Sequence, residues 1–261
     1  LQLMNDLWLA IDRNELQLHY QPKFHAPAGP VLGFEALLRW QHPKLGLLTP
    51  DLFLPLAEKT GQIIPIGNWV INEACRQLRE WHLKGHQNWS MAVNLSTLQF
   101  EQPSLVSTVL DCLTRHQVPP EMLILEVTET TAMSNPDGSV RVLTELTKAG
   151  VKASIDDFGT GYSSLLYLKR LPACELKIDR AFVKELSGES EDATIVSAIV
   201  ALAKTLNLKV VAEGVETEAQ QAFLTELGCN TLQGYLLGKP VSAQTIETLC
   251  EQGEILPDTE S

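Results

Sequence analysis

Acidic and amide side chains recur where segments typical of β-strands end, and their types point to metal-assisted chemistry on a phosphate. Six segments place a polar or charged residue at or next to the same end: Asn94, Glu126, the pair Asp156-Asp157, Lys177, Glu213 and Gln233. Glu35, on an early strand, adds another acid. Carboxylates that converge on one place cannot all stay ionised without counterions, and oxygen ligands select hard cations such as Mg²⁺ or Mn²⁺. We therefore predict a divalent-metal site with oxygen ligands.

The adjacent pair Asp156-Asp157 favours two metal ions over one. Where a chain turns at a strand end, both carboxylates can reach one site, and one of them can bridge two metals. Two metals about 3.5–4 Å apart are a recurring device for in-line phosphoryl chemistry. The pair is followed by the glycine-rich segment 158–164, which is typical of a functional loop.

Lys177 lies on a strand whose alternation predicts where its side chain points. Glu175, Lys177 and Asp179 share one face, and the apolar residues between them share the other. The apolar face must pack against helices, so Lys177 and Asp179 should point into the interior. A lysine there is costly unless it is paired or serves a site. A purely structural pair of Lys177 with Asp179 remains the alternative.

Strand and helix signals alternate along the whole chain. The strand-like segments are 16–21, 31–38, 90–95, 122–127, 151–156, 174–178, 208–213 and 230–235. The helical segments are 66–84, 104–116, 138–148, 162–169, 192–206, 216–227 and 242–251, with a short helix near 51–59. Such alternation predicts parallel βαβ units, and eight of them favour a closed α/β barrel, with polar strand ends at one rim. An open doubly wound sheet is the rival, but its glycine-rich dinucleotide fingerprint is absent.

The composition indicates a globular chain with an acidic surface. A net charge of −12 argues against contact with nucleic acid or anionic membrane, and an anionic substrate would need metal ions or local basic groups to enter. The five cysteines form no C-x-x-C pair, which favours free thiols in a reducing compartment, so we expect a cytoplasmic location. No apolar run approaches the roughly 18 residues of a membrane span.

No linker, repeat or low-complexity tract divides the chain. We therefore expect one domain over residues 1–261, with a frayed acidic tail over 254–261. Because the sequence begins at Leu1 and not at Met, we also expect that it is excised from a longer multidomain protein.

Eight short motifs occur in a fixed order over nearly the whole chain. They are YQPK at 20–23, EALLRW at 35–40, VNLS at 93–96, EVTE at 126–129, DDFGTGYSSL at 156–165, LKID at 176–179, EGVE at 213–216 and QGYLLGKP at 233–240. Together they resemble the EAL-domain family of cyclic di-GMP phosphodiesterases, whose naming tripeptide stands here as Glu35-Ala36-Leu37. One such tripeptide alone would mean little, but eight motifs in register are specific.

The resemblance implies a modified (β/α)8 barrel in which one early strand runs antiparallel. It also implies two Mg²⁺ or Mn²⁺ ions. The first would be held by Glu35, Asn94, Glu126 and Asp156, the second by Asp156 and Asp157, and Glu213 would contact a metal directly or through water.

The resemblance further implies hydrolysis of cyclic di-GMP to linear 5′-pGpG by in-line attack of water. Lys177 would hold that water and act with Glu213, and Glu129 would organise the loop 156–165. That loop and the following helix would form a regulatory homodimer. The residues implied in substrate binding are Gln21, Leu38, Arg39, Asp179, Gln233, Tyr235 and Pro240.

Three other functions remain open. A cyclic di-GMP receptor without turnover and a protein-interaction module would share the fold, but both are expected to have lost acids at the strand ends. A phosphoesterase acting on a different diester would keep them.

Overall fold

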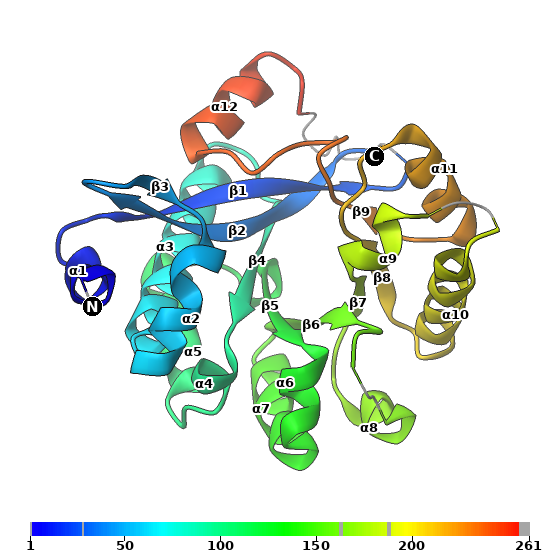
Figure 1. The fold of residues 1–261 in the computed structure, drawn as a ribbon, viewed down its shortest axis with the longest axis horizontal. Helices are drawn as coiled ribbons and strands as arrows, with labels where there is room; N and C mark the ends of the chain where they lie inside the picture. Colours follow the sequence, from blue (N-terminus) through cyan, green and yellow to red (C-terminus); the bar gives the residue numbers. More distant parts are fainter. Residues whose placement is uncertain (1, 28, 162–163, 187–188, 256–261) are drawn as a thin grey trace.

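A closed barrel of eight strands forms the centre of the molecule. The computed structural model describes residues 2–27, 29–161, 164–186 and 189–255, so most of the expected tail 254–261 lies outside the described residues. The barrel strands are β1 (Leu16–His25), β2 (Val31–His42), β4 (Ser90–Leu95), β5 (Leu123–Thr128), β6 (Lys152–Phe158), β7 (Glu175–Ile178), β8 (Lys209–Ala212) and β9 (Thr231–Leu232). They follow the order β1-β9-β8-β7-β6-β5-β4-β2, and pairing of β1 with β2 closes the ring (Figure 1).

The first strand runs against both of its neighbours. β1 is antiparallel to β2 and to β9, while the pairings from β2 through β4 to β9 are parallel. This confirms the expected modified barrel. In the β1–β2 register Gln21 stands opposite Glu35, and Lys23 stands opposite Gly33. The amino-terminal half of β1 therefore lies at the rim where the other strands end.

Helices surround the barrel wall. The predicted helices correspond to α2 (Pro50–Thr60), α3 (Ile63–Leu83), α5 (Leu105–His116), α7 (Pro136–Lys148), α8 (Leu165–Arg170), α10 (Glu191–Thr205), α11 (Glu218–Leu227) and α12 (Ala243–Glu251). Residues 162–163 of the expected helix 162–169 lie outside the described residues. Helix α11 shows why such boundaries can be read from sequence. It begins with a reciprocal Thr217–Gln220 capping box and ends at Gly228, whose φ of 97° suits only glycine well.

Several short elements have no counterpart among the predicted ones. They are α1 (Gln2–Ala10), β3 (Gly46–Leu48), α4 (Thr97–Phe100), the 3₁₀ turn η1 (Pro120–Met122), α6 (Glu129–Ser134) and α9 (Arg180–Lys184). All but α1 are too short to show a hydrophobic period, and α1 buries only Leu7 and Ala10. The last predicted strand, 230–235, is only two residues long in the structure, because the chain leaves the wall after Leu232.

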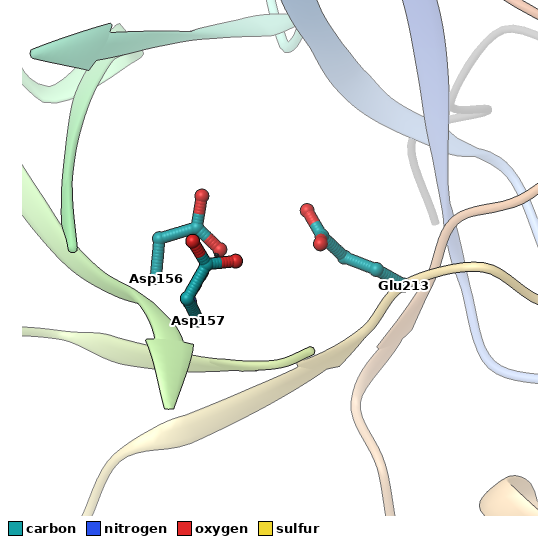
Figure 2. A group of neighbouring side chains, drawn as sticks. All are labelled: Asp156, Asp157 and Glu213. Carbon is teal, nitrogen blue, oxygen red and sulfur yellow. Dashed lines mark hydrogen bonds between the residues drawn. The ribbon is translucent and has the colours of Figure 1, made fainter. Parts of the chain in front are cut away.

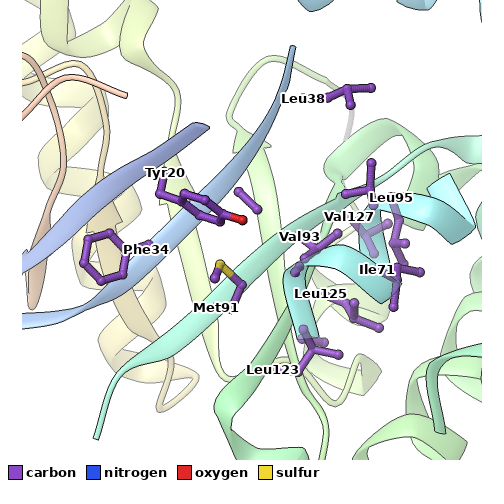
Figure 3. Close-up of a cluster of buried hydrophobic side chains, with 14 of the residues drawn as sticks. Tyr20, Phe34, Leu38, Ile71, Met91, Val93, Leu95, Leu123, Leu125 and Val127 are labelled. Atoms are coloured by element: carbon purple, nitrogen blue, oxygen red, sulfur yellow. The ribbon is translucent and has the colours of Figure 1, made fainter. Parts of the chain in front are cut away.

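The apolar core lies between the barrel wall and the helices. Met91, Val93 and Leu95 on β4 and Leu125 on β5 face outward, toward the helices, and share a buried apolar cluster with Ile71 of α3 (Figure 3). The opposite faces of β4 and β5 carry Asn94 and Glu126 into the interior. Packing of the outer faces thus fixes which side chains the barrel encloses. None of the helices in the described part of the chain has the length and hydrophobicity that a bilayer crossing requires.

Candidate active site

A cavity of about 690 Å³ opens at the rim where the parallel strands end. It gathers residues from β1, β2, β6, the β7 and β8 ends and the segment after β9, which are far apart in sequence. The predicted site residues that line it are Gln21, Glu35, Arg39, Asp156, Asp157, Asp179, Glu213, Gln233, Tyr235 and Pro240. Lys177 and Glu126 lie beneath its floor, where both side chains are fully buried.

Lys177 stands at the centre of four acids. Its Nζ lies 2.5 Å from Glu213 Oε1 and 2.6 Å from Glu126 Oε2. It also lies 3.5 Å from Glu35 Oε2 and 3.5 Å from Asp156 Oδ2. Burial lowers the pKa of Lys177, but these carboxylates outweigh it and raise the pKa well above its ordinary value, so the ammonium is charged. Lys177 therefore points into the barrel interior, as predicted, and pairs with the acids there.

The alternative of a structural pair between Lys177 and Asp179 does not occur among the described residues; Asp179 caps a helix instead. Its Oδ1 accepts a hydrogen bond of 2.7 Å from the amide of Ala181 and caps α9. The side chain lines the cavity and does not belong to the ion pairs of Lys177 among the described residues. The strand ends at Ile178, so the alternation that placed the two side chains together stops before Asp179.

Glu35 accepts one hydrogen bond from the neighbouring strand β4 and one from the segment just beyond β9. Asn94 Nδ2 donates to Glu35 Oε1 at 2.8 Å, and Gln233 Nε2 donates to Glu35 Oε2 at 2.6 Å. Burial raises the pKa of Glu35, but Lys177 and these two hydrogen bonds outweigh it, so the pKa falls below its ordinary value. Glu35 is thus kept ionised at the mouth of the barrel. Gln233 also donates to Gln21 Oε1 at 2.9 Å, which links the reversed strand β1 to the site.

Asp156, Asp157 and Glu213 form a compact group of carboxylates. One ligand oxygen from each lies within 4.8 Å of the others, and Figure 2 shows Glu213 pointing across toward the aspartate pair. Consecutive strand residues normally face opposite sides, but the β6–β7 register is irregular between Ile155 and Phe158, and Asp157 has a φ of 52°. This local left-handed turn lets both aspartates face the cavity.

The site carries more negative charge than its own cations balance. Burial and the neighbouring Asp156 raise the pKa of Asp157 to about 7. Burial, with Asp156 and Glu35, outweighs Lys177 and raises the pKa of Glu213 to about 8. Burial and Glu35 raise the pKa of Glu126 well above its ordinary value, and Glu126 Oε1 has no hydrogen-bond partner among the described residues.

These observations fit the binding of hard divalent cations. Excess carboxylate charge and a buried carboxylate oxygen without a donor are what such an ion would neutralise. Asp156, Asp157 and Glu213 already converge on one point. The other predicted ligands, Glu35, Asn94 and Glu126, surround Lys177 or bond to one another beside that group.

Glu129, the first residue of α6, ties down the glycine-rich loop. Its Oε2 accepts hydrogen bonds from the amides of Gly159 at 3.0 Å and Gly161 at 3.2 Å. Gly159 has a φ of 95°, which glycine adopts without strain. Glu129 is buried, so a single charged oxygen fixes two loop amides directly after the aspartate pair.

Leu38 does not fit its predicted substrate contact. Along β2, Glu35, Leu37 and Arg39 face the site cavity, and this places Leu38 on the opposite face. The Leu38 side chain instead lines a separate cavity of about 440 Å³ bordered by α2 and α3. Leu37 borders both cavities, so the alternation of β2 would have favoured Leu37 as the contact.

Arg180, Glu216 and Gly234 also line the site cavity and were not among the predicted residues. Arg180 follows directly after the motif LKID, and the turn at Asp179 brings it to the rim. Gly234 follows Gln233, and a Cβ there would lie only 2.2 Å from the backbone of Val215. That close approach explains why a glycine stands at this point, and the dipeptide Gln233-Gly234 was its only signal in the sequence.

Comparison with known proteins gives a consistent result. The family model described as the EAL domain matches residues 4–240. The chain is 64% identical over 246 residues to the bifunctional diguanylate cyclase/cyclic di-GMP phosphodiesterase MucR of Pseudomonas aeruginosa, covering 94% of this chain and 36% of that protein. It is 46% identical to the cyclic di-GMP phosphodiesterase NbdA of the same species, covering 95% of this chain and 32% of NbdA. The chain thus spans about a third of the length of these curated relatives.

Solved structures agree with this. The fold matches a PaMucR phosphodiesterase in complex with c-di-GMP with a TM-score of 0.92 and 64% identity, covering 94% of this chain and 100% of that one. It also matches the EAL enzyme Bd1971 in its cAMP and cyclic-di-GMP bound form, with a TM-score of 0.89 and 35% identity, covering 95% of this chain and 68% of that one.

Proposed function

This chain belongs to the EAL domain family, and on that premise we propose that it is a metal-dependent phosphodiesterase that hydrolyses cyclic di-GMP to linear 5′-pGpG. The observation that carries the proposal is the ring of acids around Lys177 at the base of a cavity large enough for a small-molecule substrate. The relatives named as cyclic di-GMP phosphodiesterases support the choice of substrate.

Two hard divalent cations, Mg²⁺ or Mn²⁺, would be held by Glu35, Asn94, Glu126, Asp156, Asp157 and Glu213. When bound, such ions neutralise a phosphodiester and make a water molecule a stronger nucleophile. The site holds more carboxylates than lysines, so it would repel a substrate that carries two phosphates. Two bound divalent cations would offset that repulsion.

Lys177 and Glu213 are the residues that would handle the attacking water. Their side chains are 2.5 Å apart, so a water bound beside one is within reach of the other. In this proposal Lys177 orients the water, Glu213 accepts its proton, and the 3′ oxygen departs on the opposite side.

Recognition of the dinucleotide would fall to the rim of the cavity. Arg39 is half buried and spends one donor on the carbonyl of Leu38, at 2.8 Å, which leaves other guanidinium donors for a phosphate or a guanine edge. Tyr235 is 59% exposed beside the cavity and offers a ring face for a base. Gln21, Asp179, Gln233 and Pro240 complete the proposed contacts.

We also propose a homodimer through the loop 156–165 and α8. Leu165 and Leu166 at the start of α8 are 60% and 67% exposed, although large apolar side chains favour burial. Because Glu129 joins this loop to the site, an interface there would act on Asp156 and Asp157. The free cysteines of the chain suit a reducing compartment, and we propose that the reaction takes place in the cytoplasm.

The test is a product assay. Purified protein is incubated with cyclic di-GMP and Mg²⁺ or Mn²⁺, with and without EDTA, and pGpG is measured by chromatography. We expect pGpG only in the presence of free metal. Binding of cyclic di-GMP without any pGpG would identify a receptor, and faster cleavage of another diester in a panel of cyclic and linear dinucleotides would identify a different substrate.

A further inference from the structure

A second buried ion pair lies inside the barrel, below the ring of acids. Lys23 on β1 is 4% exposed, and its Nζ lies 3.3 Å from Glu175 Oε1 on β7. The same Nζ lies 3.9 Å from Glu126 Oε1. The pair spans the barrel between strands that are 152 residues apart in sequence. Sequence reasoning gave neither residue a role in the site.

Glu175 stands directly below Lys177 on the same face of β7. Two residues along a strand correspond to a rise of about 6.5 Å. A lysine side chain is long and flexible enough to span that distance, so the ammonium of Lys177 could turn down to Glu175 as well as up to the rim acids.

Lys23 is the cation that pairs with Glu175. Among the described residues, Lys23 is the one cation within ion-pair distance of Glu175, although the charge of Lys177 also reaches it. A buried carboxylate that loses its cation is strongly destabilised and takes up a proton or attracts the next available cation. Without Lys23, that next cation is Lys177.

We propose that Lys23 is a positioning residue: by neutralising Glu175 it leaves Lys177 free to stay with Glu126 and Glu213 at the rim. This rests on the proposed phosphodiesterase activity only through the part that Lys177 plays in it. The pairing that positions Lys177 is a property of the barrel interior itself.

Three variants test the proposal. Lys23→Met keeps the length of the side chain and removes its charge, so it leaves Glu175 unpaired. The double variant Lys23→Met/Glu175→Met removes both charges, and Lys23→Arg keeps the positive charge. Lys84→Met is the matched control, because Lys84 is an exposed lysine that pairs with Glu80 and Glu247 far from the barrel interior.

For Lys23→Met we expect kcat to fall by about tenfold or more while KM for cyclic di-GMP changes less than about threefold. The double variant should recover kcat to within about threefold of wild type, because nothing then competes for Lys177. The kcat of Lys23→Arg should lie between those of Lys23→Met and the double variant, and the kcat of Lys84→Met should match that of wild type. A crystal structure of Lys23→Met should place Lys177 Nζ next to Glu175.

A folded Lys23→Met protein with wild-type kcat would overturn the proposal. So would a double variant that melts like wild type but stays as slow as Lys23→Met, because Lys23 would then act through something other than Glu175. If Lys23→Met does not fold, the double variant decides alone, and a folded double variant with kcat at least about tenfold below wild type contradicts the proposal. If wild type itself forms no pGpG, the proposed function fails, and the position of Lys177 in the Lys23→Met structure still tests this inference.

Discussion

Lys177 Nζ lies 2.6 Å from Glu126 Oε2, and neither side chain is exposed to solvent. A buried pair of this kind contributes little net stability. Removal of one partner leaves the other as an unpaired buried charge, which destabilises the protein by about 3–5 kcal/mol. Lys177 is therefore both the proposed holder of the attacking water and the cation that keeps the acids compatible in the absence of metal.

Lys177→Met should remove both roles. We expect turnover to fall by at least about 100-fold. In EDTA, the free energy of unfolding from urea denaturation should fall by about 3–5 kcal/mol. Addition of Mn²⁺ should raise the melting temperature of the variant more than that of wild type, since the ion then replaces the missing charge. Equal shifts in both proteins would show that Lys177 does not balance the metal ligands.

Glu35→Ala should remove a proposed metal ligand and the acceptor of Asn94 and Gln233. We expect turnover in saturating Mg²⁺ to fall by at least about 100-fold and the apparent affinity for Mn²⁺ to fall, measured by calorimetry. Glu121→Ala is the matched control, because Glu121 is an exposed acid at the other end of β5. Full turnover of Glu35→Ala with Mg²⁺ would mean that the metal assignment is wrong.

Glu129→Ala should loosen the loop after the aspartate pair. It takes away the acceptor of the Gly159 and Gly161 amides, and a hydrogen bond to a charged group is worth about 1.5–3 kcal/mol. We expect faster amide exchange at Gly159 and Gly161 and roughly tenfold lower turnover. Glu129→Gln, which retains an acceptor oxygen, should lie in between. Unchanged exchange at both glycines in Glu129→Ala would refute this role for Glu129.

Asp157→Asn should stabilise the metal-free protein in a pH-dependent way. The pKa of Asp157 is raised to about 7 in the folded protein, so the folded state binds a proton that the unfolded chain releases near its ordinary, lower value. The contribution of this group to stability is therefore present at low pH and is lost as pH rises from about 4 to about 7.

In EDTA, the melting temperature of Asp157→Asn should thus exceed that of wild type at pH 8, and the difference should shrink at pH 5. Each kcal/mol corresponds to about 2–4 °C for a chain of this size. A difference that grows toward acid pH would have the wrong sign for a raised pKa.

Leu166→Glu should weaken the proposed homodimer. Leu166 is 67% exposed, so the change introduces no buried charge in the single chain. We expect sedimentation to shift toward the monomer and turnover per chain to fall, while wild type loses turnover per chain on dilution. Leu83→Glu, a change at a similarly exposed leucine on α3, is the control. Turnover that never varies with protein concentration would count against control by dimerisation.

Much of the architecture could be predicted from local patterns, because helices of ten or more residues and alternating strands have distinct periods. The direction of β1 could not be read from such patterns. Inward and outward residues alternate in the same way whichever way a strand runs, so Gln21 and Lys23 would face inward in either direction. The reversed strand followed from the family resemblance alone.

The rim acids were predictable because charged residues at the ends of apolar strands stand out. The interior pair of Lys23 and Glu175 was not, since alternation predicts which face of a strand a residue occupies but not which distant strand its side chain meets. For Leu38, a shift of one residue along β2 decides which face the side chain occupies. For Arg180, the turn at Asp179 decides whether the side chain reaches the rim. A bulge such as the one at Asp157 shifts alternation by one residue and is not visible in a strand pattern.

The reversal of β1 also changes which end of the barrel each connection occupies. In a regular eightfold barrel, every segment that follows a strand contributes to the substrate side. Here the segment after His25 joins β1 to β2 at the far end, and the chain instead arrives at the substrate side from α1 through Glu15, whose carbonyl accepts a bond of 2.8 Å from Gln41. A reporter peptide inserted between β1 and β2 would therefore lie at the end of the barrel opposite the site cavity. One inserted ahead of β1 would lie beside the cavity.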